Sequence, residues 1–242
     1  MANVNARDRL ILAVDVPSAD SAEQLLTRLG TAVSFVKIGL ELYTAAGPDF
    51  VRRVIGRGKR VFLDLKFLDI EETVRRATAV VAGMGVEFLT VHANRKALTA
   101  AVEGRGQHQD RSDLKLLAVT VLTNFDEADL RDLGMKWKVA DLVAARANLA
   151  AEVGCNGVVA SGEEPAAIRK RLGEGFLIVT PGIRPSGTRP DNHARVTTPT
   201  QAINAGADYL VVGRPIRDAA DPQAAAEAIL AEMQAAFDNL KN

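Results

Sequence analysis

Residues 61–69 read VFLDLKFLD, an apolar run followed by alternating charged and apolar side chains. The run Val61–Leu63 is typical of a buried strand in a parallel sheet. Alternate residues of a strand share a face, so Asp64 and Lys66 are expected to project together. Burying an unpaired ion is costly. The stretch therefore predicts either a functional site or a solvated ion pair where a strand leaves the core.

Similar aliphatic runs recur along the chain, each followed by a helical stretch. We expect eight strands, at Leu10–Val16, Phe35–Ile38, Arg60–Lys66, Phe88–His92, Leu116–Val121, Gly157–Ala160, Leu177–Thr180 and Tyr209–Gly213. Amphipathic segments rich in Ala, Leu, Glu and Arg lie between them, among them Ser21–Leu29, Glu71–Met84, Val139–Val153 and Pro165–Leu172. Helix ends are expected at four glycines, Gly30, Gly85, Gly154 and Gly206.

Strands that alternate with helices imply parallel pairing through crossover connections. Eight such units in 242 residues predict an α/β protein with one (β/α)8 (TIM) barrel domain over residues 1–242. Residues 1–8 are expected to form a polar N-terminal extension. The alternative is an open doubly wound sheet, but Asp15-Val16-Pro17-Ser18 stands where that fold would carry Gly-x-Gly-x-x-Gly.

The composition narrows the class of protein. The chain is 48% hydrophobic and has 30 basic and 30 acidic residues, so it lacks the basic charge that favours nucleic acid or an anionic membrane. No apolar run approaches the ~20 residues that span a bilayer, and the first eight residues are polar. Cys155 is the only cysteine, which excludes an intramolecular disulfide and a cysteine-rich metal site. We expect a cytoplasmic protein with no nucleic-acid or membrane partner.

Polar residues gather at the predicted C-terminal ends of the strands, where barrels carry their active sites. These residues are Asp15, Lys37, Asp64, Lys66, His92, Thr123, Thr180 and Arg214. The last two strands lead into Gly182 and Arg184 and into Gly213 and Arg214. Loops at these positions often bind phosphate, because glycine permits close backbone approach and arginine supplies bidentate donors. The sequence therefore predicts a phosphate site there.

The carboxylate and lysine residues are compatible with two kinds of site. Asp64, Asp69 and a further acid could hold a divalent metal ion. Alternatively, Lys37, Asp64, Lys66 and Asp69 could form a metal-free array in which the lysines keep both acids ionised. Lys37 places a cation in the same cavity, which opposes a metal ion there and favours the array.

Six motifs together resemble the bacterial orotidine 5′-phosphate decarboxylases. They run in order from residue 10 to residue 217, and are Asp15, Val36-Lys37-Ile38-Gly39, Asp64-x-Lys66-x-x-Asp69-Ile70-x-x-Thr73, Leu122-Thr123, Thr180-Pro181-Gly182-Ile183-Arg184-Pro185 and Val212-Gly213-Arg214-Pro215-Ile216. Related barrels share the acid and lysine motif alone, whereas the full set is specific to this family.

The resemblance implies conversion of orotidine 5′-monophosphate to UMP and CO2, the last step of de novo pyrimidine (UMP) biosynthesis, without metal or cofactor. Lys66 would protonate C6 of the pyrimidine, Asp64 would lie beside the departing carboxylate, and Lys37 and Asp69 would complete the array. A homodimer with shared active sites is implied, because Asp69 and Thr73 would reach the neighbouring subunit's site.

The remaining implied roles concern substrate binding. Asp15 and Lys37 would bind the ribose hydroxyls and Thr123 the pyrimidine edge, and the phosphate would be held by Arg184, Gly213 and Arg214. His193 stands where the family usually has a glutamine that reaches toward phosphate, and histidine can donate the same hydrogen bond. A surface histidine is the alternative. Leu68, Glu71-Glu72 and Asn124 also depart from the family pattern.

Three other residues receive structural interpretations. His92 is expected to be a hydrogen-bonded residue at the barrel rim, and Cys155 a packing residue. Trp137, in the polar connection 125–138, could cover part of the cavity or an interface, and that connection could be a lid or a linker with its own helix. The long polar segment 181–196 is expected to be a functional loop.

Two other functions stay open at this point. One is that of a magnesium-dependent sugar-phosphate decarboxylase or aldolase, which resembles this chain at the acid and lysine motif but carries an acid where Lys37 stands. The other is a catalytically silent barrel that binds a phosphate ligand. Turnover without added metal would separate the decarboxylase from both.

Overall fold

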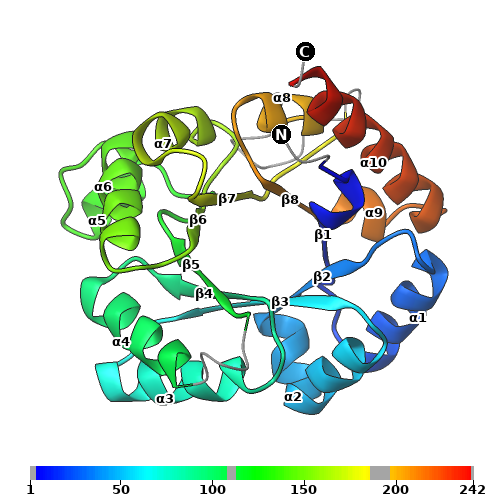
Figure 1. The fold of residues 1–242 in the computed structure, drawn as a ribbon, viewed down its shortest axis with the longest axis horizontal. Helices are drawn as coiled ribbons and strands as arrows, with labels where there is room; N and C mark the ends of the chain where they lie inside the picture. The colour runs from blue at the N-terminus through cyan, green and yellow to red at the C-terminus, as the bar shows by residue number, and fades with distance from the viewer. Residues whose placement is uncertain (1–3, 108–112, 186–196, 241–242) are drawn as a thin grey trace.

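The computed structural model describes residues 4–107, 113–185 and 197–240. Eight parallel strands close into a barrel in chain order, which confirms the (β/α)8 prediction and shows that the open sheet was wrong (Figure 1). The strands are β1 (Leu10–Ala13), β2 (Phe35–Gly39), β3 (Arg60–Phe67), β4 (Phe88–His92), β5 (Lys115–Val119), β6 (Gly157–Val159), β7 (Leu177–Thr180) and β8 (Tyr209–Val212).

Helices surround the barrel as an outer ring (Figure 1). They are a short 3-10 helix η1 (Ala6–Asp8), then α1 (Ala19–Leu29), α2 (Leu40–Gly56), α3 (Glu71–Ala82), α4 (Arg95–Gly106), α5 (Glu127–Asp132), α6 (Val139–Glu152), α7 (Pro165–Leu172), α8 (Pro199–Asn204), α9 (Arg214–Arg217) and α10 (Pro222–Asn239). Within the described residues, no helix combines the length and apolar character needed to cross a bilayer.

Local signals in the sequence explain where α1 begins and ends. Its N-cap is Ser18, whose side chain accepts a hydrogen bond from the backbone of Ser21. Its buried side includes Leu25, Leu26 and Leu29, which have the spacing of an amphipathic helix. Gly30 ends it with a positive φ of 51°, a conformation that glycine adopts without steric cost.

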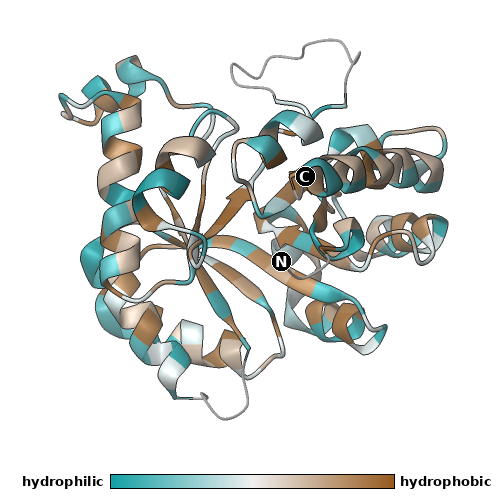
Figure 2. Ribbon diagram, turned by 45° about the horizontal axis from the view of Figure 1, so that its top comes forward, coloured by the Kyte–Doolittle hydropathy of each residue, from teal (hydrophilic) through white to brown (hydrophobic). Residues whose placement is uncertain are grey.

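The core has two layers. The larger one lies between the barrel and the helices, and Figure 2 shows the apolar colour along much of the strands and both colours along the helices. The smaller one fills the barrel near the N-terminal ends of the strands, where Phe35, Phe62, Phe88 and Tyr209 pack edge to face. Ring centroids are 5.0 Å apart for Phe35 and Phe88 and also for Phe88 and Tyr209. This aromatic plug closes the N-terminal end of the barrel, and the polar side chains described below lie at the C-terminal end.

The connection 125–138 contains the short helix α5, so it is a linker with a helix of its own. Asp126 and Asp129 form a capping box at the start of α5, which explains why this polar sequence becomes helical. Trp137 follows α5 with half of its surface exposed. The predicted loop 181–196 lies mostly outside the described residues, which end at Pro185 and resume at Thr197.

Candidate active site

Four charged side chains, from β2, β3 and the segment just after β1, meet at the C-terminal end of the barrel. The ammonium of Lys37 lies 2.9 Å from Asp15 Oδ1 and 3.4 Å from Asp64 Oδ2. The ammonium of Lys66 lies 2.8 Å from Asp64 Oδ1. The structure thus brings together four of the residues singled out in the sequence, as a chain of alternating charge.

Gly39 leaves the space that this chain of charges occupies. A Cβ atom at Gly39 would lie 3.2 Å from Asp15 Oδ1 and 3.2 Å from Lys37 Nζ. Such contacts are tighter than most that a real Cβ makes, so a side chain would displace one of the two ions. A glycine at position 39, two residues after Lys37, therefore has a steric explanation.

The surroundings keep Asp64 ionised. Burial raises the pKa of Asp64, but the ammonium groups of Lys37 and Lys66, together with hydrogen bonds from Lys66 and Thr90, outweigh it and hold the pKa below its ordinary value. The side chains of Lys37 and Asp64 are only 11% and 15% exposed, so water screens their attraction weakly. Asp64 is therefore ionised near neutral pH.

Lys66 has an unusual backbone conformation. Its φ is 50°, and it is the only described residue other than glycine with a positive φ. The register between β3 and β4 also shifts between Leu63 and Phe67, around this residue. Left-handed backbone in a side-chain-bearing residue costs roughly 1–2 kcal/mol, and such strain concentrates at functional sites. The conformation marks Lys66 as a functional candidate independently of its charge.

A cavity of about 250 Å³ opens beside the array. It is lined by Ala13, Asp15, Lys37, Thr123, Pro181, Gly182, Arg184, Val211, Gly213, Arg214 and Arg217. The residues predicted to bind phosphate therefore share one cavity with Asp15, Lys37 and Thr123. Its three arginines suit an anionic ligand.

Arg217 is a part of this cavity that the sequence reasoning missed. Its guanidinium donates to the backbone carbonyl of Asp15 at 2.8 Å and pairs with Asp218 through both Nε and Nη2. Arg217 thereby ties α9 to the end of β1. Its position three residues after Arg214, on the same helical turn, is the signal that could have found it.

Asp69 and Thr73 do not join the array within one chain. Asp69 is exposed, its Oδ1 accepts a hydrogen bond from the backbone of Ile70, and it forms no ion pair with any described residue. Thr73 is exposed in the first turn of α3. Leu68 and Ile70, which flank Asp69, are 58% and 69% exposed. His193 lies outside the described residues, so its expected role stays a prediction.

His92 lies at the barrel rim, as expected, but its ring makes no hydrogen bond to the part of the chain that the structure describes. Burial lowers the pKa of His92, and the cations Arg146 and Lys66 lower it further against an opposing effect of Asp64. The ring is therefore neutral near pH 7. Arg146, which the sequence reasoning did not single out, donates from α6 to the carbonyl of Thr120 at the end of β5.

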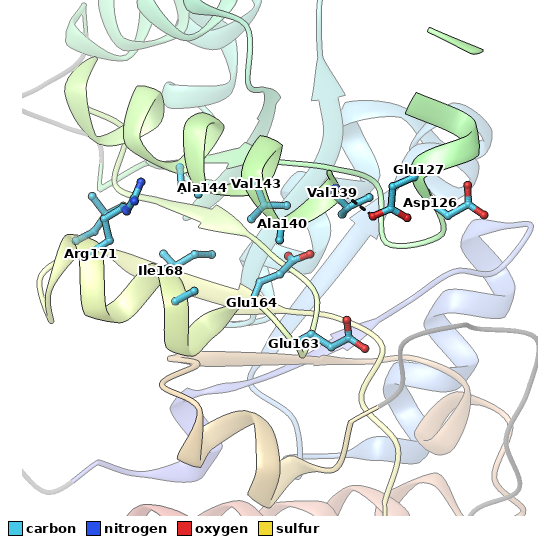
Figure 3. A pocket seen from close by; sticks show the side chains of 13 residues that line it. Asp126, Glu127, Val139, Ala140, Val143, Ala144, Glu163, Glu164, Ile168 and Arg171 are labelled. Atoms are coloured by element: carbon cyan, nitrogen blue, oxygen red, sulfur yellow. Dashed lines mark hydrogen bonds between the residues drawn. The ribbon is translucent and has the colours of Figure 1, made fainter. Parts of the chain in front are cut away.

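A second cavity shows that volume alone does not identify the site. It measures about 410 Å³ and lies between α6 and α7, where apolar side chains such as Val143 and Ile168 form its walls (Figure 3). Carboxylates of Asp126, Glu127 and Glu163 lie at one end (Figure 3). None of the lysines of the charged array reaches it, so the cavity at the barrel mouth is the candidate active site.

The metal alternative is not assembled within one chain. Both oxygens of Asp64 face ammonium groups, and Asp69 lies apart from them. Across residues 4–107, 113–185 and 197–240, no three His, Cys, Asp or Glu side chains gather closely enough to hold a metal ion. The metal-free site stays a prediction that an assay must test.

Comparison with known proteins agrees with the motifs. The model of the orotidine 5′-phosphate decarboxylase / HUMPS family matches residues 8–229. The orotidine 5′-phosphate decarboxylase of Rhodopseudomonas palustris (strain BisA53) is 50% identical over 230 residues, 95% of this chain and 96% of that protein. The corresponding protein of Nitrobacter winogradskyi is 51% identical over 228 residues, 94% of this chain and 93% of that protein.

Solved structures agree with this result. The crystal structure of orotidine 5′-phosphate decarboxylase from Lactobacillus acidophilus matches with a TM-score of 0.83 at 36% identity, covering 93% of this chain and 98% of that one. The Pyrococcus horikoshii OT3 structure of the same description matches with a TM-score of 0.74 at 28% identity, covering 93% and 99%. The chain therefore belongs to the orotidine 5′-phosphate decarboxylase / HUMPS family.

Proposed function

We propose that this protein converts orotidine 5′-monophosphate to UMP and CO2, the last step of de novo UMP biosynthesis, without metal or cofactor. The observation that carries the proposal is the array of Lys37, Asp64 and Lys66 beside a cavity lined by Arg184 and Arg214. The array supplies groups for decarboxylation and the arginines supply groups for a phosphate. The names of the 50% identical relatives support the same reaction.

The cavity accounts for substrate binding. Arg184, Gly213 and Arg214 hold the phosphate, while Asp15 and Lys37 bind the ribose hydroxyls, and Thr123 meets the pyrimidine edge. The support for this assignment is that all six residues line the same cavity. The phosphate is remote from the reacting carbon, so its binding energy can orient the pyrimidine over the array.

Lys66 performs the chemical step. The bond between C6 and the carboxylate carbon breaks, its electron pair stays on C6, and CO2 departs. A proton from the Lys66 ammonium then forms the new bond to C6, and water later returns a proton to the lysine. Negative charge develops at C6 next to a fixed ammonium, which stabilises the transition state more than the bound substrate. Asp64, ionised between Lys37 and Lys66, holds both cations in place.

Asp69 and Thr73 act in the neighbouring subunit's site, so the protein works as a homodimer. The support is that both are exposed and lie outside their own chain's array. Exposed Leu68 and Ile70 beside Asp69 favour burial against a second copy. Asp69→Ala and Lys66→Ala subunits, each inactive alone, should regain part of the activity when mixed, because one of the two shared sites is then intact. Absence of recovery despite subunit exchange would contradict sharing.

The decisive test is loss of orotidine 5′-monophosphate absorbance after adding protein dialysed against EDTA. Turnover without metal is the expected result and contradicts a magnesium-dependent sugar-phosphate enzyme. Turnover only after Mg²⁺ is restored would overturn the metal-free mechanism. UMP binding without turnover would identify a silent phosphate-binding barrel. The cytoplasmic location and the absence of nucleic-acid partners stay predictions.

A further inference from the structure

Thr90 connects Asp64 and Lys66 of β3 to the neighbouring strand β4. It is a residue of β4 with no exposed surface. Its hydroxyl accepts a hydrogen bond from the backbone N–H of Lys66 at 3.0 Å. The same hydroxyl donates to Asp64 Oδ1 at 3.0 Å. One side chain thus contacts both the backbone of the lysine and the carboxylate that the lysine pairs with.

The strand register explains why this hydroxyl is needed. Leu63 pairs with Leu89 and Phe67 pairs with Val91, so three residues of β3 lie opposite Thr90 alone. The extra residues interrupt the regular ladder of backbone hydrogen bonds, as β-bulges do. The Lys66 N–H takes the Thr90 hydroxyl as its acceptor instead. The left-handed φ of 50° at Lys66 falls inside this interruption.

We propose that Thr90 is a positioning residue, whose hydroxyl fixes the Lys66 backbone and the Asp64 carboxylate as one unit for the decarboxylation. This inference rests on the proposed function. Thr90 does not line the described cavity at the barrel mouth, so it acts through the two residues that it holds. Three requirements meet at this position: full burial, a donor and an acceptor. A threonine hydroxyl meets all of them.

Removal of the hydroxyl has a specific consequence. In Thr90→Val the shape of the side chain is kept, but the Lys66 N–H has no acceptor and Asp64 Oδ1 retains only Lys66. A buried donor without a partner is unfavourable, so the bulge will relax and move the ammonium. Displacement of a reacting group by about 1 Å can lower a rate by about 100-fold.

The test compares Thr90→Val with Thr90→Ser, which keeps the hydroxyl, and with Thr120→Val. Thr120 is equally buried, and its hydroxyl donates to the Val159 carbonyl at 3.1 Å, with no described contact to Asp64 or Lys66. We expect kcat of Thr90→Val to fall about 10- to 100-fold, with the UMP dissociation constant within about threefold of wild type. Thr90→Ser and Thr120→Val should keep most of kcat.

The pH profile is a readout that a purely structural role would not move. The charged or titratable groups facing Asp64 are Lys37 from β2, Lys66 from β3 and His92 from β4. The Thr90 hydrogen bond favours ionised Asp64, so its loss raises the pKa of Asp64. The acid limb of kcat should therefore shift to higher pH in Thr90→Val and stay in place in Thr90→Ser.

Several outcomes would overturn the inference. Wild-type kcat with an unshifted acid limb in Thr90→Val would remove the role of the hydroxyl. An equal loss in Thr90→Ser would assign the effect to the methyl group. If Thr90→Val does not fold, Thr90→Ala gives the same comparison. An inactive wild type would instead overturn the proposed function, and with it the reaction that Thr90 serves.

Discussion

The two ends of the barrel use the same residue types for different purposes. At the N-terminal end, Arg60 donates to both oxygens of Glu87, at 2.6 and 2.7 Å, and stacks 4.2 Å from the Phe35 ring centroid. Lys115 lies 3.4 Å from the same carboxylate and 5.7 Å from the Phe88 ring centroid. These three charges have partners within the chain, and the aromatic plug closes the barrel next to them.

At the C-terminal end, the charges face an open cavity. Lys37, Arg184 and Arg214 line a space that an anion can enter, together with the carboxylate of Asp15. An ion pair therefore indicates a candidate site only where its charges also border a cavity that a ligand can enter. Ion pairs enclosed by other side chains stabilise the fold, whereas ion pairs that line a cavity are also accessible to a ligand.

The largest effect is expected from removing one lysine from each end of the barrel in turn. Lys66→Ala should lower decarboxylase activity by at least about 10⁴-fold, because it removes both the proposed proton donor and the positive charge proposed to lie next to C6. UMP binding should remain largely intact, since the residues proposed to bind its phosphate, Arg184, Gly213 and Arg214, are unchanged. Lys115→Ala, the matched change at the closed end, should keep its activity. The measurement is single-turnover loss of substrate absorbance, and full activity in Lys66→Ala would remove its assigned role.

A change in the aromatic plug should affect stability instead of chemistry. Phe88 is fully buried and packs against Phe35, Phe62 and Tyr209. Phe88→Ala should reduce the free energy of unfolding by about 3–5 kcal/mol, because it deletes the ring and leaves a cavity. Urea unfolding measures the loss. If the folded variant also lost kcat at low temperature, stability and catalysis could not be assigned to separate ends of the barrel.

The pH dependence of the free energy of unfolding tests the ion pairs at the N-terminal end of the barrel. Burial raises the pKa of Glu87, but Arg60 and Lys115 outweigh it and lower the pKa below the ordinary value of 4.5. A carboxyl whose pKa is lower in the folded state adds stability above pH 4.5, and that stability is lost as pH falls through the folded pKa. Glu87→Gln should therefore cost about 1–3 kcal/mol at pH 7 and much less at pH 3. Identical losses at both pH values would contradict the charge interpretation.

The smallest effect is expected at Cys155, which lies just before β6 on the closed side of the barrel. Burial raises the pKa of its thiol to about 12, so the reactive thiolate is scarce at neutral pH. A thiol reagent should label the native protein at pH 8 far more slowly than the urea-unfolded protein and leave decarboxylase activity unchanged. Rapid labelling with loss of activity would show that this region opens to the site. The sequence expectation that Cys155 packs in the core is confirmed, since it is 7% exposed.

Much of the fold followed from periodicity. The strands predicted at Phe88–His92 and Leu177–Thr180 have the observed bounds. The first strand was expected to run to Val16 and ends at Ala13. Asp15 lies beyond the last residue of β1, and its carboxylate contacts the ammonium of Lys37 at 2.9 Å. Apolar runs predict the middle of a strand better than its end, because the end depends on how far the adjacent strands pair with it.

The site was predictable where it depends on residue type, and not where it depends on register. Asp64 and Lys66 could be placed on one face from strand alternation alone. The shift between Leu63 and Phe67 could not, because it depends on how β3 pairs with β4. Thr90 was missed for the same reason. Its proposed role depends on its contacts with Asp64 and Lys66 across the interrupted register.

The left-handed backbone at Lys66 also has a consequence for stability. Glycine adopts a φ of 50° without the steric cost that lysine bears. Replacement by glycine would relieve backbone strain in the folded state, as stabilising substitutions at functional sites often do. The same replacement would remove the ion pair with Asp64 and make the unfolded chain more flexible, and both effects oppose that gain. The folded chain therefore bears a local backbone cost at the residue that carries the ammonium, and the proposed function gives that cost a reason.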